Sequence, residues 1–327
     1  MMQKKRILIL FFSIVLIFLG MNFKFQRILH IKYEKENIVC FKGQFLNYIM
    51  LGMKPEKSII NAKILGITKE TAEFLGVLRT NKMEYIVCRI EDDLKIYDKN
   101  KKFACTYKIG KGKKKIVSFC IEDLNNDGND EILLIIGKKG EKIGNNMQIL
   151  SFDGGLKEVY NKFFSTLNPW KVQTADVDGD GKKEIAIGVY KKTKFYPIME
   201  KRPFIYEWRD GRIFPKWRGS RLSKPFDDYI FLDIDEDKMD EIIAIEVLKD
   251  GRKTINAYKW KGFGFEGIGE SGGYEQIYKI LKEDENNKIY AKVKDQENII
   301  WVVLIYKDGR WMLQDKVCDY VPIVYMK

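Results

Sequence analysis

The chain has 327 residues, of which 45% are hydrophobic and 13% aromatic, and its formal net charge is +12. A chain of this length and composition can bury a sizeable core, which argues against long disorder. The five cysteines are an odd number without a Cys-x-x-Cys pair, which excludes a disulfide scaffold and offers no zinc pattern, although one disulfide is left open.

The N-terminus combines a basic head with an apolar run. Lys4, Lys5 and Arg6 precede Ile7–Phe23, which contains no charged residue. This pattern is typical of a secretory signal or a membrane anchor, and no Ala-x-Ala-like cleavage site follows it. The run is at the short end of the roughly 17–25 residues that span a bilayer. We therefore expect one N-terminal transmembrane helix, within a signal-anchor and juxtamembrane segment over residues 1–35.

The basic head also predicts the orientation of the chain. Positive residues ahead of an anchor keep the N-terminus in the cytoplasm, so the C-terminal domain is expected outside it. This predicts a single-pass protein of the cell membrane, or a secreted protein if the N-terminal segment is cleaved. The expected partners are the membrane, through the helix, and an envelope protein or an anionic polymer. Export argues against nucleic acid as a partner. The alternative to an anionic partner is a lysine-rich surface that is simply solvated and binds no ligand.

Three acidic stretches dominate the rest of the sequence. They are DLNNDGNDE over residues 123–131, DVDGDGKKE over 176–184 and DIDEDKMDE over 233–241, and each lies between apolar, strand-like runs. They begin roughly 55 residues apart, a regular spacing that indicates one supersecondary unit per repeat. The sequence therefore predicts a repetitive protein with one acidic loop in each central repeat.

Each acidic stretch has the donor pattern of a calcium loop. Side-chain oxygens stand at positions one, three and five, a carboxylate stands at nine, and a backbone carbonyl at seven can complete the shell. The candidate ligands are Asp123, Asn125, Asp127, Asn129 and Glu131 in the first loop, Asp176, Asp178, Asp180, Lys182 and Glu184 in the second, and Asp233, Asp235, Asp237, Met239 and Glu241 in the third, where Asn129, Lys182 and Met239 offer carbonyls. Without a cation, neighbouring carboxylates repel by up to about 4 kcal/mol per pair. The expected role of Ca2+ is therefore structural.

Two alternatives compete with this interpretation. An EF-hand needs a glutamate at position twelve and a following helix, whereas Leu134, Ile187 and Ala244 stand there within strand-like runs. An acidic, solvated turn without an ion remains open for all three loops. It is strongest for the third, because Lys238 replaces the glycine of position six and must adopt a positive φ.

Tight-turn signals keep step with the acidic loops. Their markers are Gly43, Asn100, Gly154, Gly211, Gly262 and Gly309, each flanked by aromatic or aliphatic residues. One repeat is then strand, acidic loop, strand, longer connection, strand, tight turn, strand. This predicts an all-β fold over residues 36–327, a β-propeller of about five four-stranded blades. The blades are expected roughly over 55–112, 113–166, 167–223, 224–272 and 273–320, with 36–50 as an extra hairpin or closing strand.

The stretch over residues 175–189, ADVDGDGKKEIAIGV, resembles the FG-GAP or VCBS-type repeat of integrin-α-like β-propellers, and 121–136 and 232–245 are looser copies. The resemblance implies calcium in the loop that joins the first two strands of a blade. It also implies adhesion, ligand binding or scaffolding as the kind of function. The Phe-Gly and Gly-Ala-Pro elements of the family are absent, so an integrin-like ligand site is not implied.

Catalysis is disfavoured by the residue inventory. His30 is the only histidine, which argues against Ser-His-Asp and Cys-His chemistry. We expect a binding or scaffold module at the cell envelope without chemistry of its own. The alternative is an envelope hydrolase or lyase that acts on an anionic polymer through carboxylates near 216–228, namely Asp227 and Asp228. The possible anion-binding residues are Lys216, Arg218, Arg221 and Lys224, for which mutual salt bridges are the simpler explanation.

Overall fold

The computed structural model describes residues 30–33, 36–42, 47–52, 73–110, 112–164, 166–219, 221–283 and 287–317. Every regular element within these ranges is a β-strand. None of the described residues forms a helix that is long and apolar enough to cross a membrane. The expected anchor over residues 7–23 lies outside the described residues.

The chain divides into two units, Met1–Met53 and Lys54–Lys327. In the first unit, three strands form one antiparallel sheet. These strands are β1 (His30–Tyr33), β2 (Glu36–Lys42) and β3 (Asn47–Gly52). The hairpin expected over residues 36–50 corresponds to β2 and β3.

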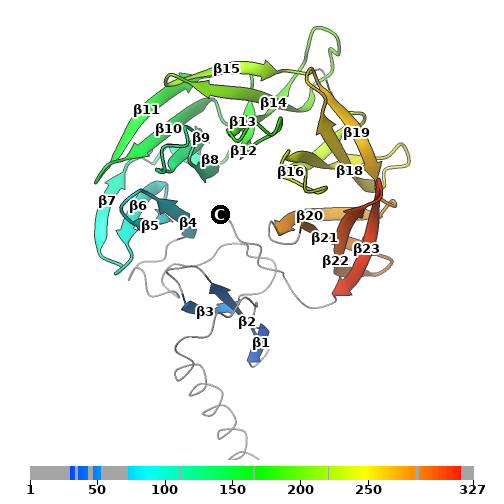
Figure 1. Cartoon of the computed structure of the whole chain (residues 1–327), viewed down its shortest axis with the longest axis horizontal. Coiled ribbons are helices and arrows are strands. Elements are labelled where there is room, and N and C mark those ends of the chain that lie inside the picture. Colours follow the sequence, from blue (N-terminus) through cyan, green and yellow to red (C-terminus); the bar gives the residue numbers. More distant parts are fainter. Residues whose placement is uncertain are drawn as a thin grey trace, which may run out of the picture. The chain divides into compact units, whose positions relative to one another are not determined.

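The second unit contains five four-stranded antiparallel sheets, and each is built from consecutive strands (Figure 1). The all-β fold predicted from the sequence is thus confirmed. The sheets are β4 (Glu73–Arg79), β5 (Glu84–Ile90), β6 (Asp93–Asp98) and β7 (Phe103–Tyr107); β8 (Lys114–Glu122), β9 (Glu131–Lys138), β10 (Asn146–Phe152) and β11 (Leu156–Phe163); β12 (Pro169–Ala175), β13 (Glu184–Lys191), β14 (Glu200–Arg209) and β15 (Arg212–Trp217); β16 (Phe226–Leu232), β17 (Glu241–Val247), β18 (Lys253–Trp260) and β19 (Phe265–Glu270); and β20 (Gln276–Glu283), β21 (Lys288–Asp295), β22 (Asn298–Lys307) and β23 (Arg310–Val317).

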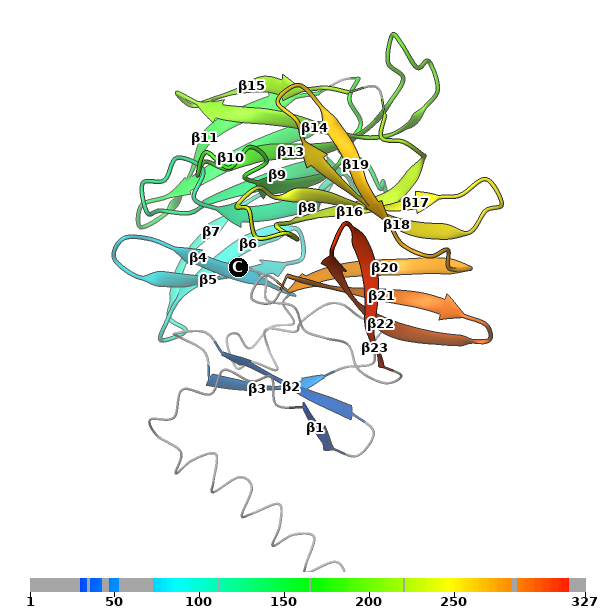
Figure 2. The same ribbon diagram turned by 45° about the vertical axis from the view of Figure 1, so that its right-hand side comes forward.

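The five sheets follow one another in chain order around a common centre. Their first strands, β4, β8, β12, β16 and β20, lie innermost, and their last strands lie outermost (Figures 1 and 2). From β4 to β20, the first strands of consecutive sheets contact one another. This arrangement is that of propeller-like blades.

The core lies between adjacent sheets, which explains the unbroken apolar runs that follow the acidic loops. Residues 131–137 of β9 are all buried, as are residues 241–246 of β17. One cluster joins Leu133 and Ile135 of β9 to Val172 and Ile187 of the next sheet. A strand covered on both faces needs apolar side chains on both, whereas the outer strands are largely exposed.

A β-bulge recurs in the first strand of every one of these five sheets. The register shifts once in each pairing of a first strand with a second strand. The extra residues are Leu75, Val117, Trp170, Asp227 and Tyr278. Because a bulge is a specific local feature, its repetition supports one common blade plan.

Candidate metal centres

The three acidic stretches are the loops between the first and second strands of three successive sheets, β8–β9, β12–β13 and β16–β17. In each, the N–H of position two donates to Oε2 of the glutamate at position nine over 3.0 Å. The pairs are Leu124 with Glu131, Val177 with Glu184 and Ile234 with Glu241. The loop is thus tied across its two ends in the same way each time.

The aspartates at positions one and five also hold the backbone. The N–H of position six donates to the first aspartate, over 2.8 Å from Gly128 to Asp123 and over 2.9 Å from Lys238 to Asp233. Gly181 and Asp176 repeat this bond at 2.9 Å. The N–H of position seven donates to Oδ1 of position five in all three loops. The three loops therefore share one backbone conformation.

Position six has a positive φ in all three loops. The angle is 83° at Gly128, 82° at Gly181 and 72° at Lys238. The expected positive φ of Lys238 is confirmed. A side chain in this region costs roughly 1–2 kcal/mol, so the third loop keeps the shared conformation at a cost that the other two avoid.

The glutamates of position nine are buried, and this sets their electrostatics. Burial raises the pKa of Glu131 and of Glu241 to about 7, and it also raises the pKa of Glu184. Neighbouring aspartates raise the pKa of Glu131 and Glu241 further, because like charges disfavour ionisation. A nearby cation would stabilise the ionised forms.

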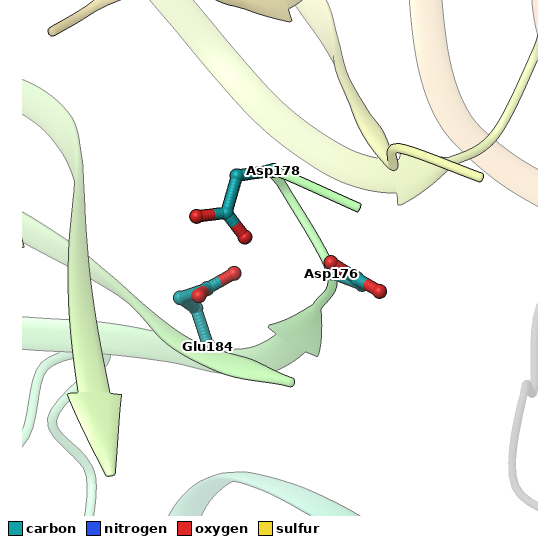
Figure 3. Close-up of side chains that lie close together, drawn as sticks. All are labelled: Asp176, Asp178 and Glu184. Atoms are coloured by element: carbon teal, nitrogen blue, oxygen red, sulfur yellow. The ribbon is translucent and has the colours of Figure 1, made fainter. Parts of the chain in front are cut away.

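The second loop fits a metal ion. Carboxylate oxygens of Asp176, Asp178 and Glu184 lie within 4.8 Å of one another, and Asp178 and Glu184 face each other (Figure 3). Asp178 Oδ1 is buried without a hydrogen-bond partner in the described part of the chain. Lys216 Nζ lies 2.6 Å from Glu184 Oε1 and also contacts Asp178 Oδ2. The oxygens that Lys216 does not reach are hard donors of the kind that calcium prefers.

The first loop offers three carboxylates and one amide, from Asp123, Asp127, Glu131 and Asn125. The Asn125 Nδ2 donates to Asp127 Oδ2 over 3.0 Å. Within the described ranges, no lysine or arginine forms an ion pair with these carboxylates. These are donor types that a divalent cation accepts. Among the described residues, the three carboxylates are not gathered within 4.8 Å of one another as those of the other two loops are.

The third loop differs because a lysine lies within it. Carboxylate oxygens of Asp233, Asp235 and Glu241 lie within 4.8 Å of one another. Lys259 Nζ is 2.6 Å from Asp235 Oδ2, 2.6 Å from Asp237 Oδ2 and 3.2 Å from Glu241 Oε1. Within the described part of the chain, Glu241 Oε1 has no hydrogen bond of good geometry, and its interaction with the ammonium group is an ion pair.

Equivalent corners of successive sheets contact one another. Asn81 of the β4–β5 turn donates to the Asp127 carbonyl over 2.8 Å. Asn126 of the first loop donates to the Gly181 carbonyl of the second loop over 2.9 Å. Asn287, just before β21, donates to Glu236 of the third loop over 3.1 Å. The loops therefore form part of a continuous row of corners.

Sequence reasoning missed the role of position eight. Asp130 accepts from the Arg79 N–H over 2.7 Å, and its own N–H donates to the Arg79 carbonyl over 2.8 Å. Arg79 belongs to the preceding sheet, so position eight joins two sheets. Burial raises the pKa of Asp130 to about 6. The available signal was the aspartate that recurs at position eight of the first and third loops.

The predicted anion-binding lysines are paired with carboxylates. Lys216 lies in the second loop, as described, and Lys224 Nζ is 3.3 Å from Glu246 Oε2 and also contacts Glu270. The Arg221 guanidinium lies 4.6 Å from the centre of the Tyr196 ring. Arg218 has no ion pair within the described part of the chain.

Asp227 and Asp228, the carboxylates of the alternative enzymatic hypothesis, pair with lysines of other strands. Asp228 Oδ1 is 2.6 Å from Lys171 Nζ, and Asp227 Oδ2 is 2.7 Å from Lys253 Nζ. Neither carboxylate has an ion pair with Arg218 or Arg221 among the described residues. The ion pairs favour a structural role for both.

A buried polar network that the sequence did not reveal fastens the segment around Ser223. Glu246 of β17 is fully buried and accepts hydrogen bonds from Asn256, over 3.0 Å, and from Tyr258. The Ser223 hydroxyl lies 3.3 Å from both carboxylate oxygens. The only signal was an acidic residue, Glu246, directly after the apolar run 242–245.

The connection between β13 and β14 presents apolar side chains to solvent. Phe195 is 84% exposed and Ile198 is 51% exposed. Arg202 is fully buried beneath this connection, which spans residues 192–199. Its guanidinium donates to the carbonyls of Lys191 over 2.9 Å, Tyr196 over 3.2 Å and Ile198 over 2.9 Å.

Comparison with known proteins identifies the repeat. The model of the FG-GAP-like repeat matches residues 123–187, from the first loop through the second. A search of curated proteins gives no significant match. A chain of the "Crystal Structure of Mitotic Checkpoint Complex" is similar over 89% of this chain and 76% of that chain, with 9% identity and a TM-score of 0.45, a likeness too weak to support any argument. The protein therefore contains an FG-GAP-like repeat, set among propeller-like four-stranded sheets.

Proposed function

We propose that this protein is a calcium-stabilised β-propeller of about five blades that binds an anionic partner at the cell envelope and performs no chemistry of its own. The observation that carries the proposal is the exposed β13–β14 connection over residues 192–199, held from below by Arg202. Propeller-like repeats supply the rigid scaffold, and binding residues commonly lie on loops that such a scaffold positions.

Arg202 fixes the backbone conformation of this connection. A buried guanidinium is costly unless hydrogen bonds compensate it. Here the carbonyls of Lys191, Tyr196 and Ile198 accept from it, while Nη1 has no partner among the described residues. The bonds fix the backbone on both sides of Phe195. The chain thus presents an exposed aromatic side chain on a fixed backbone, which supports an interaction site on this connection.

The charge around Phe195 indicates what kind of partner it meets. Lys192 and Lys194 flank it and are exposed. Lysines around an apolar tip favour a partner that combines negative charge with apolar surface. An envelope protein with an acidic surface or an anionic envelope polymer has these properties.

The location follows from the N-terminal pattern. Lys4, Lys5 and Arg6 followed by the apolar run Ile7–Phe23 support a single-pass anchor with the repeats outside the cytoplasm. Protease added to intact cells would then digest the repeats and leave a cytoplasmic marker protein uncut. Protection of the repeats in intact cells would contradict this orientation.

The calcium part rests on the first and second loops. Their donor sets fit the ion, and their role is to hold the corner between two strands. Residues that would hold it are Asp123, Asn125, Asp127 and Glu131 in the first loop and Asp176, Asp178, Asp180 and Glu184 in the second. Bound Ca2+ would neutralise carboxylates that otherwise repel one another.

Cross-linking of the full-length protein, followed by capture of its partner from envelope extracts, tests the binding function. We expect the variant F195S/I198S to lose most of the captured partner. The matched control is F263S, because Phe263 is 88% exposed on the β18–β19 turn, outside the proposed surface. Equal capture by F195S/I198S and wild type would exclude this surface, and an absence of any captured partner would contradict the binding function itself.

A further inference from the structure

We propose that the cation of the third acidic loop is the ammonium group of Lys259, and that this loop does not bind calcium. The inference refines the calcium part of the proposed function, and it departs from the sequence-based prediction that all three loops bind the ion. It stands on the position of Lys259 Nζ among the loop carboxylates.

The ammonium group lies among oxygens that a metal ion in this loop would need. Calcium sits about 2.3–2.6 Å from its oxygen ligands. Lys259 Nζ lies 2.6 Å from oxygens of Asp235 and Asp237 and 3.2 Å from Glu241 Oε1. These are the side chains of positions three, five and nine. Since both cations need the same oxygens at nearly the same distance, they exclude each other.

Lys259 is held in this place by the sheet. It lies on β18, which pairs with β17 so that Tyr258 is opposite Ile242. Lys259 therefore lies next to Glu241, the first residue of β17. Its side chain is only 11% exposed, and that of Glu241 is fully buried. An ammonium group buried among three carboxylates is a built counter-ion, unlike a mobile surface lysine.

The same register identifies the corresponding residues in the other two sheets. The strand pairings place Ser151 of β10 and Glu207 of β14 at the position of Lys259. Neither is a cation. In the second loop the lysine comes instead from the bulge of β15, where Lys216 stands. The corresponding bulge residues of the sheets that carry the first and third loops are Val159 of β11 and Ile268 of β19, and neither is a cation.

The three loops thus differ in their internal cation. The first has none among the described residues. In the second, Lys216 contacts Asp178 and Glu184, but Asp178 Oδ1 stays buried without a hydrogen-bond partner. In the third, Lys259 contacts three carboxylates. Lys259 therefore occupies the third loop, whereas Lys216 lies beside the second loop and leaves Asp178 Oδ1 without a partner among the described residues.

The test counts calcium ions bound per chain by equilibrium dialysis of the full-length protein in detergent. We expect Lys259→Met to bind one more ion per chain than wild type. The matched control is Lys253→Met. Lys253 lies on the same strand, its side chain is 13% exposed, and its partner Asp227 is outside the acidic loops. This control is expected to bind as many ions as wild type.

A gain of one ion supports the proposal whether wild type binds two ions or none. If wild type binds none, the calcium part of the proposed function fails while the role of Lys259 stands. Equal numbers for Lys259→Met and wild type would overturn the inference. Asp237→Asn in the otherwise natural chain provides a second measurement that does not depend on the lysine variant. It is expected to leave the number of bound ions unchanged, and the loss of one ion would also overturn the inference.

Discussion

Asp240 and Asp176 lie on loops of adjacent sheets and exchange two hydrogen bonds. The Asp176 N–H donates to Asp240 Oδ2 over 2.7 Å, and the Asp240 N–H donates to the Asp176 carbonyl over 2.7 Å. Lys183 Nζ adds a contact of 3.1 Å to the same Asp240 oxygen. Asp176 is also position one of the second acidic loop. The contact that joins two sheets therefore holds the backbone of a candidate metal site.

We expect Asp240→Ala to lower the free energy of unfolding by about 1–3 kcal/mol. The substitution leaves the Asp176 N–H without its acceptor in a partly buried place, and an unpaired buried donor costs about that much. Urea unfolding followed by tryptophan fluorescence measures the change. Glu266→Ala, at an exposed position on β19, is the control and is expected to stay within about 0.5 kcal/mol of wild type. A similar small change for Asp240→Ala would mean that the exchange does not stabilise the packing of the sheets.

Removal of calcium is expected to lower the melting temperature. An ion that binds only the folded state stabilises it by about 2.7 kcal/mol at a hundredfold excess over its dissociation constant. Scanning calorimetry in EDTA and in calcium chloride measures the difference. The variant Asp176→Ala/Asp180→Ala is expected to lose most of the contribution of the second loop, because two of its four side-chain ligands are removed. Identical melting curves of the wild type in both buffers would refute a structural calcium ion.

Local features of the fold could be predicted from the sequence. The runs 116–121, 132–136, 147–152 and 156–160 predict the four strands that the structure forms as β8, β9, β10 and β11. Apolar strand residues and turn glycines depend on nearest neighbours, so their signal is local. Gly154, Gly211, Gly262 and Gly309 all have a positive φ, as their turns require. The turn marked by Asn100 joins β6 to β7, and Lys101 is its residue of positive φ.

The internal cations of the loops could not be predicted. Lys216 reaches the second loop from the bulge of β15, the outermost strand of its sheet. Lys259 reaches the third loop, which joins β16 to β17, from β18. Their contacts depend on strand register, which a sequence specifies only through the packing of both faces. The exchange between Asp176 and Asp240 joins different sheets and leaves no periodic pattern. The sequence therefore indicated the oxygen donors of the candidate sites. It did not indicate the lysines that pair with these donors or the hydrogen bonds that join the loops of adjacent sheets.

Two thiols are expected to resist alkylation in the folded protein. Burial raises the pKa of Cys88 to about 12 and that of Cys120 to about 11, so both are protonated at pH 8. Because only the thiolate reacts, iodoacetamide should label them far more slowly in buffer than in urea, as measured by mass spectrometry. Their folded pKa exceeds the ordinary value of about 8.5, so their contribution to stability is lost as the pH rises above it. Labelling of Cys88 at the unfolded rate would contradict its burial.

Position six of the loop is a glycine in the first two loops and Lys238 in the third. Lys238→Gly is expected to raise the free energy of unfolding by up to about 1 kcal/mol, since glycine adopts the observed φ of 72° without strain. Gly128→Ala is the converse change. Its Cβ would lie 2.1 Å from Asn81 Oδ1 at a φ of 83°, so it should destabilise the protein and disturb the contact between the first loop and the β4–β5 turn. Urea unfolding of both variants measures the two effects. Destabilisation by Lys238→Gly would mean that the lysine side chain stabilises the third loop by more than its backbone strain costs.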